Sequence, residues 1–139
     1  MANVVYNISR QLLSSGQLDL ATADLWVMLP YGYVPDIENH EYVSAVSPFE
    51  AIGDGYTRVQ LQNVTLTRDT VNNRMVLDAD DIEWSLANFQ ADGAVIFINT
   101  GDDTTSSLLT FLDFDGVKRS QNTPFIIQWS AAEGILNLR

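Results

Sequence analysis

The single histidine, His40, is the side chain of this sequence best suited to acid–base chemistry. It follows Asp36 by four residues, so the two side chains would share one face of a helical turn, and a general base needs such an orienting partner. Ser44 and Ser47 are the nearest hydroxyls that it could activate. However, the sequence has no Gly-x-Ser-x-Gly elbow, and Pro48 disfavours regular helix here. We therefore expect His40 to fasten a loop through hydrogen bonds, and we expect no enzymatic activity.

Metal and phosphate chemistry is also poorly supported. One histidine and no cysteine cannot build a tetrahedral zinc site. The acidic runs at 78–83 and 113–115 offer the oxygen ligands that calcium prefers, but neither extends to a twelve-residue calcium loop with its final glutamate. Gly53-Asp-Gly55 lacks a following Gly-Lys-Ser/Thr, so it predicts a tight turn instead of a phosphate-binding loop. We expect neither a metal nor a cofactor.

The chain is strongly acidic, with 18 carboxylates against 7 lysines and arginines and a net charge of −11. Such a surface repels nucleic-acid phosphates and anionic lipids, so we expect no nucleic-acid partner and no membrane partner. A basic protein surface would be its electrostatic complement. No apolar run approaches the roughly 20 residues that span a bilayer, and the first residues do not resemble a signal peptide. We expect a protein made in the cytoplasm.

Short apolar or alternating stretches, separated by Gly, Pro, Asn and Asp, dominate the chain from residue 24 onward. This pattern predicts a mainly β fold, an antiparallel β-sandwich or jelly-roll-like domain with a short N-terminal helix. With 139 residues, of which 46% are hydrophobic, the chain can form one domain over 1–139. The expected strands are 24–29, 56–68, 75–77, 82–84, 94–98, 108–114, 125–129 and 135–138.

Several strands carry more specific expectations. Residues 57–78 should form a hairpin, with a bulge at Gln62–Asn63 that returns Val64 and Leu66 to the core. Residues 94–98 are apolar on both faces and should form a central, buried strand. Residues 108–114 and 125–129 should pair as a hairpin across 115–123. Three tryptophans lie within expected strands, which favours core packing over stacking on sugars: Trp26, Trp84 and Trp129.

Two segments lie outside this pattern. Residues 1–16 predict an N-terminal helical arm that is capped by Asn3 and followed by Gly16, with its apolar residues at helical spacing. A helix this short must pack either on the flank of the sandwich or on a neighbouring subunit. Residues 30–55 predict a long irregular loop rich in Tyr, Pro and Asp, and so long a loop is uncommon unless it is functional or ordered by a partner.

The chain also resembles a group of small proteins encoded among the structural genes of tailed bacteriophages. The matching segments cover most of the chain in order, from the opening Met-Ala-Asn-Val-Val-Tyr to the closing stretch 125–136. Between these ends lie the segments at 25–29, 33–36, 40–42, 53–57, 78–84 and 94–101. The resemblance implies a virion structural protein, and for some members decoration of the capsid, but it carries no catalytic residues.

From this resemblance we expect a capsid decoration (cement) protein on the outer surface of the virion. Its expected partners are the major capsid protein and further copies of itself. The expected contact residues come from the N-terminal arm and the long loop: Val4, Val5, Ile8, Tyr31, Tyr33, Ile37 and Tyr42. Two other functions stay open, a component of the phage tail, baseplate or fibre, and a carbohydrate-binding β-sandwich module.

Overall fold

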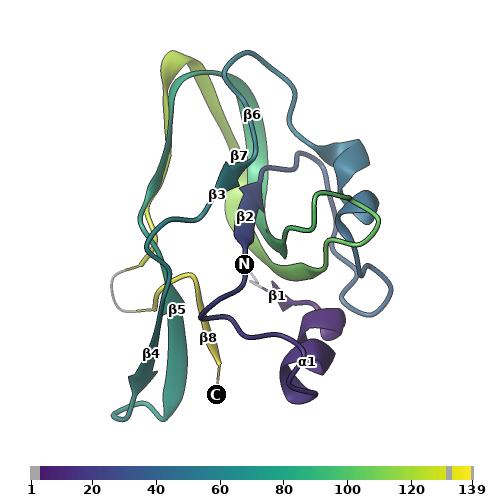
Figure 1. Cartoon of the computed structure of the whole chain (residues 1–139). Helices are drawn as coiled ribbons and strands as arrows, with labels where there is room; N and C mark the ends of the chain where they lie inside the picture. Colours follow the sequence, from purple (N-terminus) through teal and green to yellow (C-terminus); the bar gives the residue numbers. More distant parts are fainter. Residues whose placement is uncertain (1–3, 131–132, 139) are drawn as a thin grey trace.

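The computed structural model describes residues 4–130 and 133–138, which form a mainly antiparallel β fold with one short α-helix, as the sequence predicts. The strands of these residues lie in two sheets (Figure 1). The five-stranded sheet has the order β1 (Val4–Val5), β7 (Leu108–Ile127), β6 (Ile82–Ile98), β2 (Leu25–Met28) and β3 (Val59–Gln60). The three-stranded sheet, at the lower left of Figure 1, has the order β4 (Thr65–Asp69), β5 (Arg74–Asp78) and β8 (Leu136–Leu138).

Strands β6 and β7 form one long antiparallel ribbon that is central to the fold. They contain 17 and 20 residues and pair from Ile82 with Ile127 to Phe97 with Leu108. The sequence predicted separate short strands at 82–84 and 94–98, and a hairpin between 108–114 and 125–129. Both predictions are wrong. The first two segments join in β6, whereas 108–114 and 125–127 lie in β7 and pair with β6 instead of with each other.

The ribbon bends sharply near its middle. Gly93 pairs with Asp113, and Ala91 pairs with Lys118. One β6 residue, Asp92, therefore lies opposite four β7 residues, 114–117. Two of those β7 residues, Asp115 and Gly116, have positive φ angles of 60° and 129°. Such a bulge re-aims a strand, and Figure 1 shows both strands bending over at the top of the molecule. The turn-like composition of 115–123 therefore marks a bend inside a strand, which local sequence does not distinguish from a hairpin loop.

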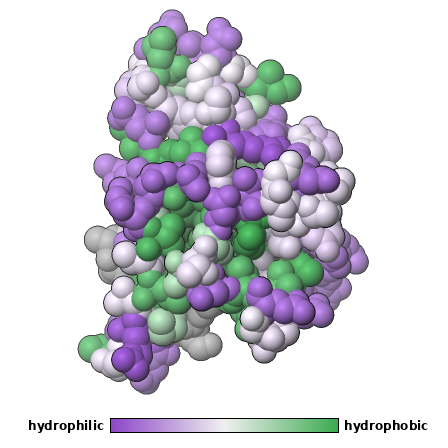
Figure 2. All heavy atoms as spheres, viewed as in Figure 1, coloured by the Kyte–Doolittle hydropathy of each residue, from purple (hydrophilic) through white to green (hydrophobic). Residues whose placement is uncertain are grey.

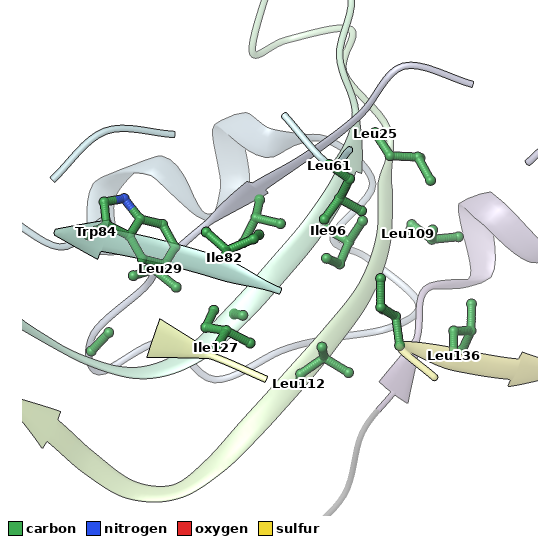
Figure 3. Packing of buried hydrophobic residues seen from close by; sticks show 14 of the residues in the cluster. Leu25, Leu29, Leu61, Ile82, Trp84, Ile96, Leu109, Leu112, Ile127 and Leu136 are labelled. Carbon is green, nitrogen blue, oxygen red and sulfur yellow. The ribbon is translucent and has the colours of Figure 1, made fainter. Parts of the chain in front are cut away.

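The straight part of β6 is buried on both faces, as predicted for 94–98. Ala94 and Ile96 pack into a core that includes residues from both sheets, among them Leu77 and Leu136 (Figure 3). The alternate residue Val95 packs into a second cluster on the opposite face of the five-stranded sheet. The molecule therefore has three layers: the three-stranded sheet, the five-stranded sheet, and a cover over the second face.

Aromatic rings fill the larger core near the bend. Trp84 is buried and its indole N–H donates to the Thr57 carbonyl at 2.8 Å. Its ring lies 6.1 Å from Phe89 and 5.8 Å from Phe125, both edge to face, and stacks on Tyr56 at 6.5 Å. The predicted core role is confirmed for Trp84, whereas Trp26 and Trp129 are partly exposed.

The N-terminal segment differs from the predicted helical arm. Val4 and Val5 form β1 and pair with Phe111 and Thr110 of β7, and the helix α1 (Asn7–Ser14) begins only after Tyr6. The predicted cap Asn3 lies outside the described residues, while Gly16 follows the helix with a φ of 77°, as expected for a residue that ends a helix. Tyr6 is fully buried among residues of the five-stranded sheet, so this segment packs on the sheet, the first of the two expected alternatives. No helix among the described residues has the length and apolarity needed to cross a bilayer.

The predicted hairpin over 57–78 is confirmed only for β4 and β5, which pair from Thr65 with Asp78 to Asp69 with Arg74. Residues 59–60 form β3, which pairs with β2 in the other sheet. The chain therefore crosses between the sheets near Asn63, whose φ is 53°. Val64 packs partly against the core, but Leu66 stays 37% exposed, so the predicted return of both residues to the core is wrong for Leu66.

Replacing Trp84 with alanine tests the aromatic core. We expect Trp84→Ala to lower the free energy of unfolding by about 3–5 kcal/mol, because it removes a buried ring and a hydrogen bond. Trp129→Ala, which removes a partly exposed ring, should cost clearly less. Denaturant unfolding followed by tryptophan fluorescence and circular dichroism measures both values, and equal losses would contradict this assignment of the core.

Candidate functional site

The 30–55 segment is irregular, but it is fastened to the sheets along its length. It contains two short 3-10 helices, η1 (Val43–Ala45) and η2 (Ser47–Phe49). Isolated β-bridges join Pro30 to Glu50, Tyr42 to Ser107 and Asp54 to Asn88. Together with α1, the segment supplies the cover over the second face of the five-stranded sheet, through buried residues that include Tyr6, Tyr33, Val43 and Val46.

Close backbone contact fixes the end of this segment. Gly53 and Gly55 lie against β6, where a Cβ on either residue would come within 2.0 Å of a backbone oxygen, that of Asn88 or Leu86 respectively. Only glycine fits such an approach, and Gly55 also has a positive φ of 84°. The predicted tight turn at 53–55 is therefore a docking point for the loop.

A partly buried chain of hydrogen bonds holds the other half of the segment. The His40 Nδ1 atom lies 3.1 Å from the backbone N–H of Asp36, which can only donate, so Nδ1 is the acceptor and the ring proton is assigned to Nε2. The Tyr33 hydroxyl then donates to Nδ1 at 2.7 Å and accepts from the Tyr6 hydroxyl at 2.8 Å. These contacts give His40 the loop-fastening role that the sequence favours.

Burial and hydrogen bonding shift the pKa values of groups in and beside this hydrogen-bond chain. Burial raises the pKa of the Tyr6 hydroxyl well above its usual value, and its donation to Tyr33 raises it further. Burial also raises the pKa of Tyr33. Hydrogen bonds from Asn39 lower the pKa of the Asp36 carboxyl. Tyr6 and Tyr33 are therefore neutral hydrogen-bonding groups, and the carboxylate of Asp36 is held in its charged form.

An arginine between two carboxylates ties this segment to the neighbouring 99–107 loop. The Arg58 guanidinium donates to both oxygens of Glu50 at 2.9 Å each, and to both oxygens of Asp103 at 2.7 and 3.0 Å. It also lies over the Phe97 ring, 5.6 Å from the centroid. Glu50 accepts a further short hydrogen bond from the Tyr56 hydroxyl. Such paired, bidentate contacts restrain both loops against β6.

The outer side of the 30–55 segment exposes apolar side chains, which we call the loop patch: Tyr31, Pro48, Phe49 and Ile52. Tyr31 and Phe49 are 44% and 43% exposed, and Ile52 is 92% exposed. Together with Glu50 and Gln90, these residues line a shallow hollow of about 280 Å³. On the face drawn in Figure 2, apolar residues reach the surface in groups among hydrophilic ones.

Of the predicted contact residues, only Tyr31 belongs to the loop patch. Tyr33 and Val5 are buried, so their prediction as surface contacts is wrong. Val4 and Ile8 are partly buried and pack against the cluster beneath the cover. Ile37 and Tyr42 are partly buried in the long segment.

Sequence reasoning missed Phe49 and Ile52, the other strongly apolar members of the patch. Ile52 directly precedes the Gly53-Asp-Gly55 turn, but neither its residue type nor this position signals exposure in the sequence. Within the described part of the chain, no group of three or more His, Asp or Glu side chains could hold a metal ion.

Comparison with known proteins found no matching family model, no similar curated protein and no similar solved structure.

The Arg58 network predicts how stability depends on pH. The hydrogen bonds from Arg58 hold the pKa of Asp103 below its usual value of 3.8, so this carboxylate stabilises the fold above that pH and the stabilisation is lost as the pH falls through the lower, folded value. Asp103→Asn should therefore lower stability at pH 7 and reduce the loss of stability on acidification below about pH 4. Thermal unfolding of both proteins over this range tests the prediction, and parallel pH profiles would contradict it.

Proposed function

We propose that this protein is a non-enzymatic virion structural protein of a bacteriophage, which binds the outer surface of the major capsid protein shell and stabilises it. The resemblance to small structural proteins of tailed bacteriophages motivates the proposal. The observation that carries it is the loop patch, a group of apolar side chains held outward on a restrained segment of an acidic protein.

A restrained contact surface suits permanent binding. The backbone of the patch is tied to β6 by the Asp92 N–H, which donates to Pro30 at 3.1 Å, and by the Asp92 carboxylate, which accepts from the Gly32 N–H at 3.0 Å. Binding costs less entropy when the contacting loop is already ordered. Aromatic side chains such as Tyr31 and Phe49 are enriched at protein interfaces, and Ile52 adds exposed apolar surface beside them.

The charge of the protein fits the outside of a particle. A net charge of −11 disfavours contact with packaged nucleic acid and favours a basic protein surface around an apolar contact. A patch of this size supports only modest affinity for one copy. Many copies on a shell would nevertheless stabilise it together, because each copy that bridges adjacent subunits must be released before those subunits can separate.

The exposed Ile52 allows a sharp test of this proposal. Ile52→Asp should weaken binding to purified shells of the major capsid protein from the same virus by at least about tenfold, because it places a charge in the apolar contact. Val71→Asp is the matched control: Val71 is 88% exposed at the tip of the β4–β5 hairpin, at the bottom of Figure 1. Sedimentation of shells with bound protein measures both affinities.

The two substitutions separate the possible outcomes. Both replaced side chains are almost fully exposed, so both variants should keep the melting temperature of the parent protein. Loss of binding in the Ile52 variant alone supports the loop patch. Equal binding by all three proteins would show that another surface contacts the shell, and absence of binding by the parent protein would contradict capsid decoration itself.

A further inference from the structure

The bend of β7 carries an unusual arrangement of charges. Asp113 precedes the bend, Asp115 and Val117 lie within it, and Lys118 and Arg119 follow it. The side chains of Asp115, Lys118 and Arg119 are exposed, and Val117 is 51% exposed. Lys118 and Arg119 are adjacent cations in a chain with only 7 lysines and arginines, of which Arg58 and Arg74 lie in ion pairs within the fold. The exposed Arg119 guanidinium donates to the side-chain oxygen of Gln90, a neutral group that leaves its charge uncompensated.

When two copies of this segment run in opposite directions, the acidic residues of one copy face the basic residues of the other. If two copies met around a twofold axis near Gly116 and Val117, with their bends antiparallel, Asp115 of each copy would lie opposite Lys118 of the other and close to Arg119. A twofold interface brings the same patch of both subunits together, so it requires a surface of this kind. A like-charged or uncharged bend would lack this complementarity.

The shape of the surface beside the bend fits the same contact. A hollow of about 390 Å³ adjoins Lys118 and Arg119 and has apolar side chains in its wall, Phe114 and the half-exposed Ile126 among them. A second copy related by the twofold axis would bring its exposed Val117 to this region. An apolar contact at the centre with charged groups around it is the usual layout of a protein interface.

Extension of the sheet by regular strand pairing is a less suitable mode of contact here. The β7 edge carries Pro124, which has no N–H to donate, and residues with positive φ at Asp115 and Asn122. Proline, lysine and bulges on an edge strand oppose the addition of another strand. The contact must therefore be made by side chains.

We propose that the bend of β7 is a self-association surface, through which two copies of this protein form a twofold dimer by pairing Asp115 with Lys118 and Arg119 around Val117. The inference goes beyond the proposed function and does not depend on it, because the dimer can be measured in the absence of any capsid. In a capsid decoration protein, such a dimer would join two loop patches.

The test is charge reversal, followed by analytical ultracentrifugation of the full chain. Lys118→Glu/Arg119→Glu should raise the dimer dissociation constant at least about tenfold, because several charge pairs become repulsive. Arg10→Glu/Arg68→Glu is the matched control: both pairs of substitutions change four charge units, from −11 to −15, and Arg10 and Arg68 are exposed elsewhere. This control should dimerise like the parent protein.

A mixing experiment distinguishes pairing at the bend from a general effect of charge. Asp115→Lys alone should also weaken the homodimer, and Asp113 is left unchanged because its side chain accepts a hydrogen bond from the Asp115 N–H. Mixing Asp115→Lys with Lys118→Glu/Arg119→Glu should restore dimers, since each variant now presents the charge that the other lacks.

A parent protein that stays monomeric at about 100 μM would overturn the inference, because its dissociation constant would then exceed that concentration. Dimers that persist equally in all variants would also overturn it, because the contact would then lie elsewhere. A dimer of the parent protein that weakens between about 50 mM and 500 mM salt supports it without any substitution. None of these outcomes bears on shell binding by the loop patch, so the two proposals fail separately.

Discussion

The double-sided burial of β6 is the constraint on which the rest of this structure depends. Residues 94–98 place Ala94 and Ile96 on one face of the sheet and Val95 and Phe97 on the other, and all four side chains are almost fully buried. A strand of this kind cannot lie in a sheet with one face open to water, because its outer residues would expose a broad apolar surface. The fold must therefore supply two covers.

The two covers are built differently. The three-stranded sheet and the far half of the β6–β7 ribbon close the larger core, and the bend in the ribbon makes this possible. The second face is closed by α1 and the irregular 30–55 segment, which relies on polar contacts for its order: the chain from Tyr6 through Tyr33 to His40, and the pairing of Arg58 with Glu50 and Asp103. These contacts hold the segment in place, and its remaining apolar side chains face outward.

Several parts of this organisation could be predicted from the sequence, because they depend on local patterns. The alternation of apolar and polar residues, together with the turn residues, identifies the β class and most strand segments. The apolar run at 94–98 indicates that this strand is buried on both faces. The absence of a Gly-x-Ser-x-Gly elbow and the presence of Pro48 near His40 favour a structural role for this side chain, which its contacts with Tyr33 and Asp36 fit. The irregularity of 30–55 is equally visible in its composition.

The errors arise where distant residues decide the structure. Residues 115–123 have turn-like composition, yet only 115–117 belong to the bend, and most of 118–123 pairs with β6 as part of the strand. Tyrosine is a residue type that is common at interfaces. The Tyr33 hydroxyl, however, forms a hydrogen bond with the hydroxyl of Tyr6, 27 residues away in the sequence, and Tyr33 lies in the interior. Val4 and Val5 fit the spacing of an apolar helix face. They form a strand instead because they pair with the edge of β7. Exposure of Phe49 and Ile52 likewise follows from how the segment docks.

Copy number per virion tests capsid decoration most directly, by quantitative mass spectrometry of purified particles with the major capsid protein as the internal reference. The proposal predicts a ratio to that protein near one, or a simple fraction such as about one third, set by the symmetry of the shell. A few copies per particle would contradict decoration and indicate a tail or baseplate component. Complete absence from particles would contradict a virion role altogether and favour the carbohydrate-binding alternative.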